Sequence, residues 1–172
     1  MKHLSLSFLL LLLTAASLSV FAVEPASSAR LDEVAERGRQ VMPFDLEKTT
    51  HVFTKTNDGG RQEVLVKASK HKEQIRLIRE HLSAIAANFA KGDFSGPAQI
   101  HGEDMPGLAE MKSARPGQVK FTYRELPKGA RIDFSTQDRS LIDAIHSYFD
   151  AQLRDHARHA TMGGAHSHMH GQ

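Results

Sequence analysis

The 172-residue chain contains no cysteine and no tryptophan. Without cysteine it can form no disulfide framework and offers no thiolate to a metal ion or a nucleophilic reaction. Aromatic residues make up only 6% of the chain, and the formal net charge is only +2. Because no basic stripe with interleaved aromatic residues is present, we expect no nucleic-acid partner. Stability must come from an apolar core, and any soft metal ligand must be Met or His.

Motifs of common enzyme classes are also missing. The chain has no G-x-S-x-G elbow, and its Ser, His and Asp residues do not form a nucleophilic triad pattern. The glycine pairs at residues 59–60 and 163–164 lack the spacing of a phosphate-binding or dinucleotide-binding loop. The sequence therefore leaves catalysis open and gives it little support.

One apolar run, residues 4–23, follows Lys2 at the start of the chain. A short basic segment, an apolar stretch and the small-x-small sequence ending at Ala22 are typical of a secretory signal peptide. We predict cleavage near Ala22, export to the periplasm and no membrane attachment afterwards. A transmembrane anchor is the alternative, but the run is interrupted by Ser and Thr and is short for a span of about 20 apolar residues.

The order strand, turn, strand, helix occurs twice in the remaining chain. We expect strands over residues 51–56, 63–68, 119–124 and 130–135, and helices over residues 75–91 and 138–160. Both turns contain glycine, and both helices carry apolar residues at spacings of three and four. The prediction is an α+β fold of order ββαββα. It has one four-stranded antiparallel sheet with two main helices on one face, plus a short N-terminal helix.

This pattern divides the chain into four parts. They are a signal peptide over residues 1–22, an N-terminal lead and short helix over 23–41, a single α+β domain over 42–160, and a flexible His- and Met-rich tail over 161–172. The tail carries His166, His168 and His170 close to Met162. Dense imidazole and thioether donors bind late transition metals, so we expect the tail to collect them.

Histidine is the most unusual feature of the composition, with eleven residues in the chain. His101 and Met105 flank a Gly-Glu-Asp segment in an expected loop over residues 100–107, where both could contact one ion. The alternative is a tight turn in which His101 caps a carbonyl and Met105 fills the core. His81 is carried toward the same region by the middle helix.

Further histidines are candidates for the same interior site. His51 begins the first strand and His146 follows an apolar position of the last helix, while His156 and His159 lie three apart near its end. A lone histidine on such a face is usually structural, but several in one small domain predict a buried imidazole-rich site. Binding there requires neutral histidine and should weaken below about pH 6.

Two motifs, Val-Met-Pro-Phe-Asp-Leu with Thr-Thr-His over residues 41–51 and Ile-His-Gly-Glu-Asp-Met-Pro-Gly over residues 100–107, resemble a family of small exported bacterial proteins. The similarity covers residues 38–160, and it implies that His51, His81, His101 and Met105 belong to the shared motifs. Members of that family sometimes carry the name aspartate carbamoyltransferase. The chain lacks the Ser-Thr-Arg-Thr and His-Pro-x-Gln motifs of a true transcarbamoylase, and the resemblance implies no activity.

Our first functional hypothesis is a periplasmic metal-binding protein, a copper chaperone, carrier or buffer, with zinc as the other ion considered. Its partner would be a periplasmic metalloprotein or an efflux system. A non-catalytic protein-interaction module with structural histidines is one alternative. A haem-binding protein, with haem held by two His or by His101 and Met105, is another. A small lyase-like or hydrolytic enzyme using His101 with Glu103 is the last.

Overall fold

The computed structural model describes residues 23–164 of the chain. This part forms five α-helices: α1 (Ser28–Val41), α2 (Lys72–Phe89), α3 (Ser95–His101), α4 (Leu108–Ser113) and α5 (Arg139–Asp155). A single 3-10 turn, η1 (Leu46–Lys48), precedes the first strand. The strands are β1 (Thr49–Thr56), β2 (Gly59–Val66), β3 (Lys120–Leu126), β4 (Gly129–Ser135) and β5 (Ala160–Met162).

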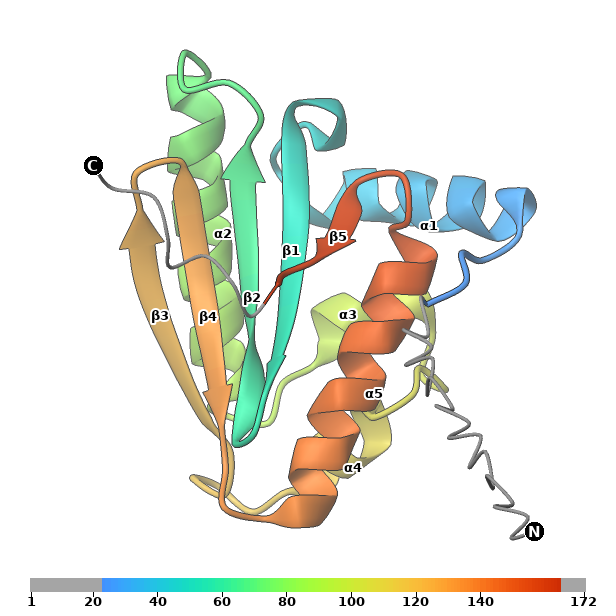
Figure 1. Cartoon of the computed structure of the whole chain (residues 1–172), viewed down its shortest axis with the longest axis vertical. Coiled ribbons are helices and arrows are strands. Elements are labelled where there is room, and N and C mark those ends of the chain that lie inside the picture. The colour runs from blue at the N-terminus through green and yellow to red at the C-terminus, as the bar shows by residue number, and fades with distance from the viewer. Residues whose placement is uncertain (1–22, 165–172) are drawn as a thin grey trace, which may run out of the picture.

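The strands form one mixed sheet in the order β3-β4-β2-β1-β5 (Figure 1). All neighbouring pairs are antiparallel except β1 and β5, which run parallel with His51 opposite Ala160. The α+β class is confirmed, but the prediction of four antiparallel strands is wrong in detail. Three residues are too short for an alternating pattern to appear, and β5 forms because the chain returns from α5 beside β1.

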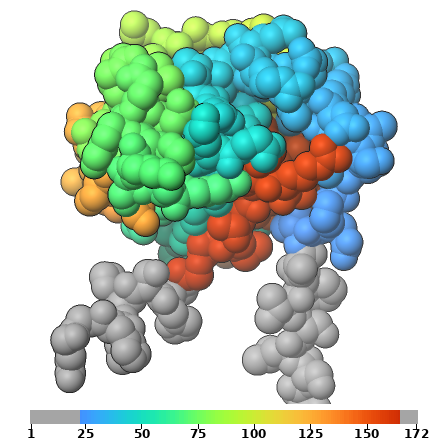
Figure 2. All heavy atoms as spheres, turned by 90° about the horizontal axis from the view of Figure 1, so that it is seen from above, coloured from blue at the N-terminus to red at the C-terminus, as the bar shows by residue number. Residues whose placement is uncertain are grey.

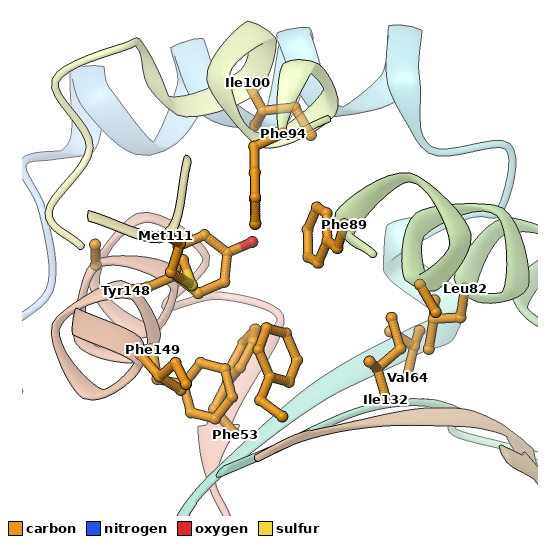
Figure 3. Packing of buried hydrophobic residues seen from close by; sticks show 14 of the residues in the cluster. Phe53, Val64, Leu82, Phe89, Phe94, Ile100, Met111, Ile132, Tyr148 and Phe149 are labelled. Carbon is orange, nitrogen blue, oxygen red and sulfur yellow. The ribbon is translucent and has the colours of Figure 1, made fainter. Parts of the chain in front are cut away.

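Helices α2 and α5 pack on the same face of the sheet. The ring of Phe134 on β4 lies 6.1 Å from that of Phe89 on α2 and 5.2 Å from that of Phe149 on α5. Figure 3 shows this core, with Phe53 and Phe149 next to the sheet and the Tyr148 hydroxyl directed into the middle of the cluster, toward Phe94 and Phe89. The apolar stripes predicted for these two helices are therefore the surfaces that build the core.

Helix α1 closes one side of this core. The Ser27 side chain caps the start of this helix by accepting a hydrogen bond from the Arg30 N–H, and Val34 in the middle of the helix is fully buried. Helix α3 begins beside Phe94 and is followed by Gly102, whose φ of 100° suits glycine. The sequence predicted no element over residues 95–99 and placed residues 100 and 101 in a loop. Because α3 has seven residues, periodicity could not reveal it; its Pro97 sits in the first turn, where proline is tolerated.

The N-terminal and C-terminal parts of the described chain meet at one end of the sheet. Figure 2 looks down on this end and shows the blue N-terminal segment, the cyan segment near residue 50 and the red C-terminal segment packed against one another. His51 N–H donates to the His159 carbonyl there, at 2.8 Å, and Ala26 N–H donates to the Arg154 carbonyl, at 3.1 Å. Side chains far apart in the sequence are thus brought together.

Within residues 23–164, no helix has both the length and the apolar character needed to cross a membrane. The predicted signal peptide over residues 1–22 lies outside the described residues, as do the tail histidines His166, His168 and His170.

Candidate functional site

Three histidines from different elements meet inside the protein. His51 comes from β1, His101 is the last residue of α3, and His156 follows the last residue of α5. Each is at most 5% exposed. The ring of His156 stacks on that of His51, with centroids 5.3 Å apart, and meets the ring of His101 edge-on at 4.9 Å.

His101 and His156 face each other through their Nε2 atoms, which lie 3.2 Å apart. On its other side, His101 Nδ1 lies 2.8 Å from Asp155 Oδ2, so Nδ1 carries the proton and donates it to the carboxylate. In the neutral tautomer with the proton on Nδ1, His101 Nε2 accepts the hydrogen bond that the Nε2–H of His156 donates. The result is a buried row of hydrogen-bonded groups in the order Asp155, His101, His156.

Arg30 from α1 fixes this row at its outer end. Its Nη2 donates to Asp155 Oδ2 at 2.9 Å and to the His101 carbonyl oxygen at 2.6 Å. Burial alone would raise the pKa of Asp155, but hydrogen bonds from His101 and Arg30 outweigh that effect and lower it to about 2. Asp155 is therefore a permanent carboxylate that holds the orientation of the His101 ring.

A small cavity of about 40 Å³ opens beside the imidazoles, with room for about three water molecules. Its polar lining consists of His51, Gln62, His81, His101, Tyr148, Gln152 and His156. The remaining lining is apolar and includes Met42, Phe44 and Ile100. Gln152 Nε2 donates to the Tyr148 hydroxyl at 2.8 Å, so this amide nitrogen is already engaged.

Burial lowers the pKa of three cavity imidazoles, those of His51, His81 and His156, and so favours their neutral form. It lowers the pKa of His51 to about 4, with repulsion from the His81 and His159 imidazoles adding to the effect, and lowers that of His81 to about 4. The pKa of His156 falls well below its ordinary value for the same first reason. Neutral imidazole is the form that binds metal ions, so the site is ready for a ligand at neutral pH.

One buried nitrogen of the cluster is unsatisfied. Among the described residues, His51 Nδ1 has no hydrogen-bond partner although it is shielded from solvent. Within the same residues, no set of three or more His, Asp or Glu side chains already surrounds a possible ion position. The parallel stacking of His51 on His156 explains this, because nitrogens in parallel ring planes do not point to one centre.

The structure brings together some of the residues predicted from the sequence and separates others. His51, His81 and His101 line one cavity. Met105 is buried in the core outside that lining. His146 lies at the β1–β2 turn, where its Nε2 donates to the carbonyls of Thr56 at 3.0 Å and Gly59 at 2.9 Å.

The partner of His101 also differs from the sequence-based pairing with Glu103. Glu103 is exposed and pairs with Lys112 at 2.6 Å, whereas Asp155 contacts the His101 ring. Sequence analysis did not identify Asp155, Arg30 or Met42 as site residues, and it named His156 only as one of several histidines near the end of the last helix. The one sequence feature that pointed to these residues was the adjacent pair Asp155-His156 at the end of an amphipathic helix. The contact of this pair with α3 appears only in the folded chain.

The fold and the site together define an α+β protein with a buried imidazole cluster held by a carboxylate. Neither any protein-family model, nor any curated protein, nor any solved structure matches this chain. The resemblance drawn from the two sequence motifs thus stays a prediction.

Proposed function

We propose that this protein binds one late transition-metal ion, copper in the first place, between His101 and His156. It would serve as a carrier, chaperone or buffer in the exported compartment and would catalyse no reaction. The observation that carries the proposal is the 3.2 Å separation of the two Nε2 atoms. Two nitrogens bound at about 2.0 Å to a tetrahedral ion lie about 3.3 Å apart, so an ion can replace the shared proton without a change in this separation.

The environment of His101 supports this assignment. A metal-binding histidine commonly donates its second ring N–H to a carboxylate, which fixes the ring and strengthens the nitrogen that binds the ion. Asp155 occupies that position, and Arg30 holds Asp155 in turn. Two supporting layers behind one imidazole exceed what a packing role requires.

His51 is a third imidazole beside the proposed ion. His51 Nδ1 is buried and, in residues 23–164, unpaired, which is an unfavourable state for a polar atom. Rotation of the His51 ring out of its stack would give this nitrogen a partner in a bound ion. A haem, by contrast, needs a pocket of several hundred Å³ and would not fit the 40 Å³ cavity without opening the core.

The test is a metal titration of a chain whose tail cannot contribute. We call it the tail-silenced chain, and it carries M162L, H166N, H168N, M169L and H170N. This chain should bind one equivalent of copper or zinc, and adding H101N should abolish tight binding. H71N is the matched control, because His71 lies at the start of α2, outside the cavity lining of the described chain, and its side chain makes no capping bond there.

Two results would contradict the proposal: no binding by the tail-silenced chain, or unchanged binding after H101N. Either result would favour the alternative class, an interaction module in which the histidines only support the core. Circular dichroism of each variant separates loss of the site from loss of the fold.

A further inference from the structure

Met42 places a thioether next to the imidazole cluster. It follows α1 directly, is 7% exposed and lines the same cavity as His51, His101 and His156. Its side chain folds over Gly38, where an added Cβ would lie only 2.6 Å from Met42 Cε. The missing side chain at Gly38 therefore leaves the space that Met42 occupies.

We infer that Met42 is a ligand of the bound ion and makes the cavity selective for Cu(I) over Zn(II). This inference rests on the function proposed above and adds the identity of the ion. Thioether sulfur is a soft donor that favours Cu(I), whereas Zn(II) takes nitrogen, oxygen and thiolate donors. Two converging imidazoles and one thioether form a donor set typical of Cu(I).

The number of donors favours the same ion. Structural Zn(II) sites are almost always four-coordinate. In residues 23–164 no three His, Asp or Glu side chains are arranged around one point, so the nitrogen and oxygen donors alone fall short of that number. Cu(I) is satisfied by two or three donors, and a sulfur atom is the natural addition to the His101–His156 pair.

The charge of the surroundings also favours a monovalent ion. The carboxylate of Asp155, which contacts His101, is offset by the guanidinium of Arg30 at 2.9 Å. A dication would thus bring two uncompensated charges into a buried, mostly apolar cavity. The cost of burying an ion rises with the square of its charge, so Cu(I) is much cheaper to accommodate.

Met42 also marks a route to the cavity. Met42 and Phe44 line both the interior cavity and a larger groove of about 690 Å³. The groove carries exposed charged residues, among them Asp32, Arg39 and Glu47. Met42 and Phe44 thus lie between the groove and the buried imidazoles.

The experiment compares M42L with M105L, both in the tail-silenced chain. Leucine conserves the volume of methionine, and Met105 is an equally buried methionine outside the cavity lining given for the described chain, so packing effects are matched. Affinities for Cu(I), without oxygen, and for Zn(II) are measured by competition with chromophoric chelators. M42L should weaken Cu(I) binding about 10- to 100-fold and leave Zn(II) binding nearly unchanged. Loss of a residue that only supports a metal ligand already has an effect of this size, so loss of a ligand should have at least the same effect.

X-ray absorption of the Cu(I)-loaded chain gives a second readout that needs no variant. A sulfur atom bound to copper should be present in the tail-silenced chain and in M105L, and absent in M42L. If copper shows only nitrogen neighbours, or if M42L binds Cu(I) as tightly as M105L does, the inference is overturned while the metal site stands. If H101N changes neither affinity, the proposed function itself fails.

Discussion

Asp155 is the residue on which the orientation of the site depends. It holds His101 Nδ1 at 2.8 Å and receives Arg30 at 2.9 Å. We expect D155N to weaken metal binding about 10- to 100-fold, because an amide supports the imidazole less well than a carboxylate does. D150N is the matched control on the same helix: Asp150 pairs with Lys55 near the surface. Equal effects of the two variants on metal affinity would contradict the role of Asp155.

The low pKa of Asp155 also determines the pH range in which acid breaks its ion pair with Arg30. The folded-state pKa is about 2, below the unfolded value near 3.9, so the stabilising effect is present above pH 4 and is lost as pH falls toward 2. Its size is about 1–2 kcal/mol for a carboxylate that is mostly buried.

The buried histidines act in a higher pH range. The pKa of His51 is about 4 in the folded protein and near 6.5 when unfolded, so the unfolded chain binds more protons between these values. The metal-free protein should therefore lose stability as pH falls from 6.5 to 4. H51F should reduce the slope by up to about 1.4 kcal/mol per pH unit, measured by urea unfolding at several pH values. An unchanged slope would show that His51 does not titrate as described.

His146 illustrates a histidine whose role is structural. Its Nε2 donates to two carbonyls in the β1–β2 turn, those of Thr56 and Gly59. H146A should lower the free energy of unfolding by about 1–2 kcal/mol, because two buried acceptors lose their donor. Metal affinity should stay at the level of the parent chain. A loss of metal affinity comparable to that of H101N would return His146 to the list of ligands.

At the scale of elements, glycine sets the contact between α4 and α5. Gly107 precedes α4 with φ of 76°, and a Cβ there would lie 2.0 Å from the Ala144 carbonyl oxygen on α5. Gly92 has a similar φ of 79° but, within the described chain, a Cβ there would contact nothing within 4 Å. These two positions therefore separate backbone strain from a clash between elements.

We expect G92A to lower the free energy of unfolding by about 1–2 kcal/mol, the cost of a left-handed conformation for a residue with a side chain. G107A should cost at least about 2 kcal/mol more, because α4 must move away from α5. Chemical unfolding of both variants provides the comparison. If they are equally destabilised, α4 and α5 are not packed as closely as the structure shows.

Sequence patterns predicted those elements whose signals are local. The apolar stripe from Ile75 to Phe89 predicted α2, and the helix expected from residue 138 begins at Arg139, with Asp138 as its cap. Helix α3 was missed because seven residues carry no period, and β5 because its pairing with β1 depends on the path of the chain after α5.

The same limit applies to the site. His51, His81 and His101 could be predicted because histidine is unusually frequent in the chain and each of the three adjoins an apolar residue of its segment. Asp155 and Arg30 looked like ordinary charged helix residues, and only the packing of α1 and α5 against α3 reveals their contacts. Sequence spacing placed Met105 near His101, whereas the thioether that lines the cavity belongs to Met42, about 60 residues earlier.

At the scale of the whole molecule, the fold brings side chains from four different elements into one site. Helix α1 supplies Arg30, β1 supplies His51, and the ends of α3 and α5 supply His101 and His156. Because these segments are widely separated in the chain, the site should form only when the whole domain folds. A bound ion would then stabilise the entire fold, and not one element alone.

The central claim, that an ion binds between His101 and His156, is tested most directly by anomalous diffraction at the copper absorption edge from crystals of the copper-loaded protein. The account predicts one strong peak within bonding distance of both Nε2 atoms, with Asp155 still on His101 Nδ1. Copper found only elsewhere, with the two Nε2 atoms still joined by a proton, would contradict it.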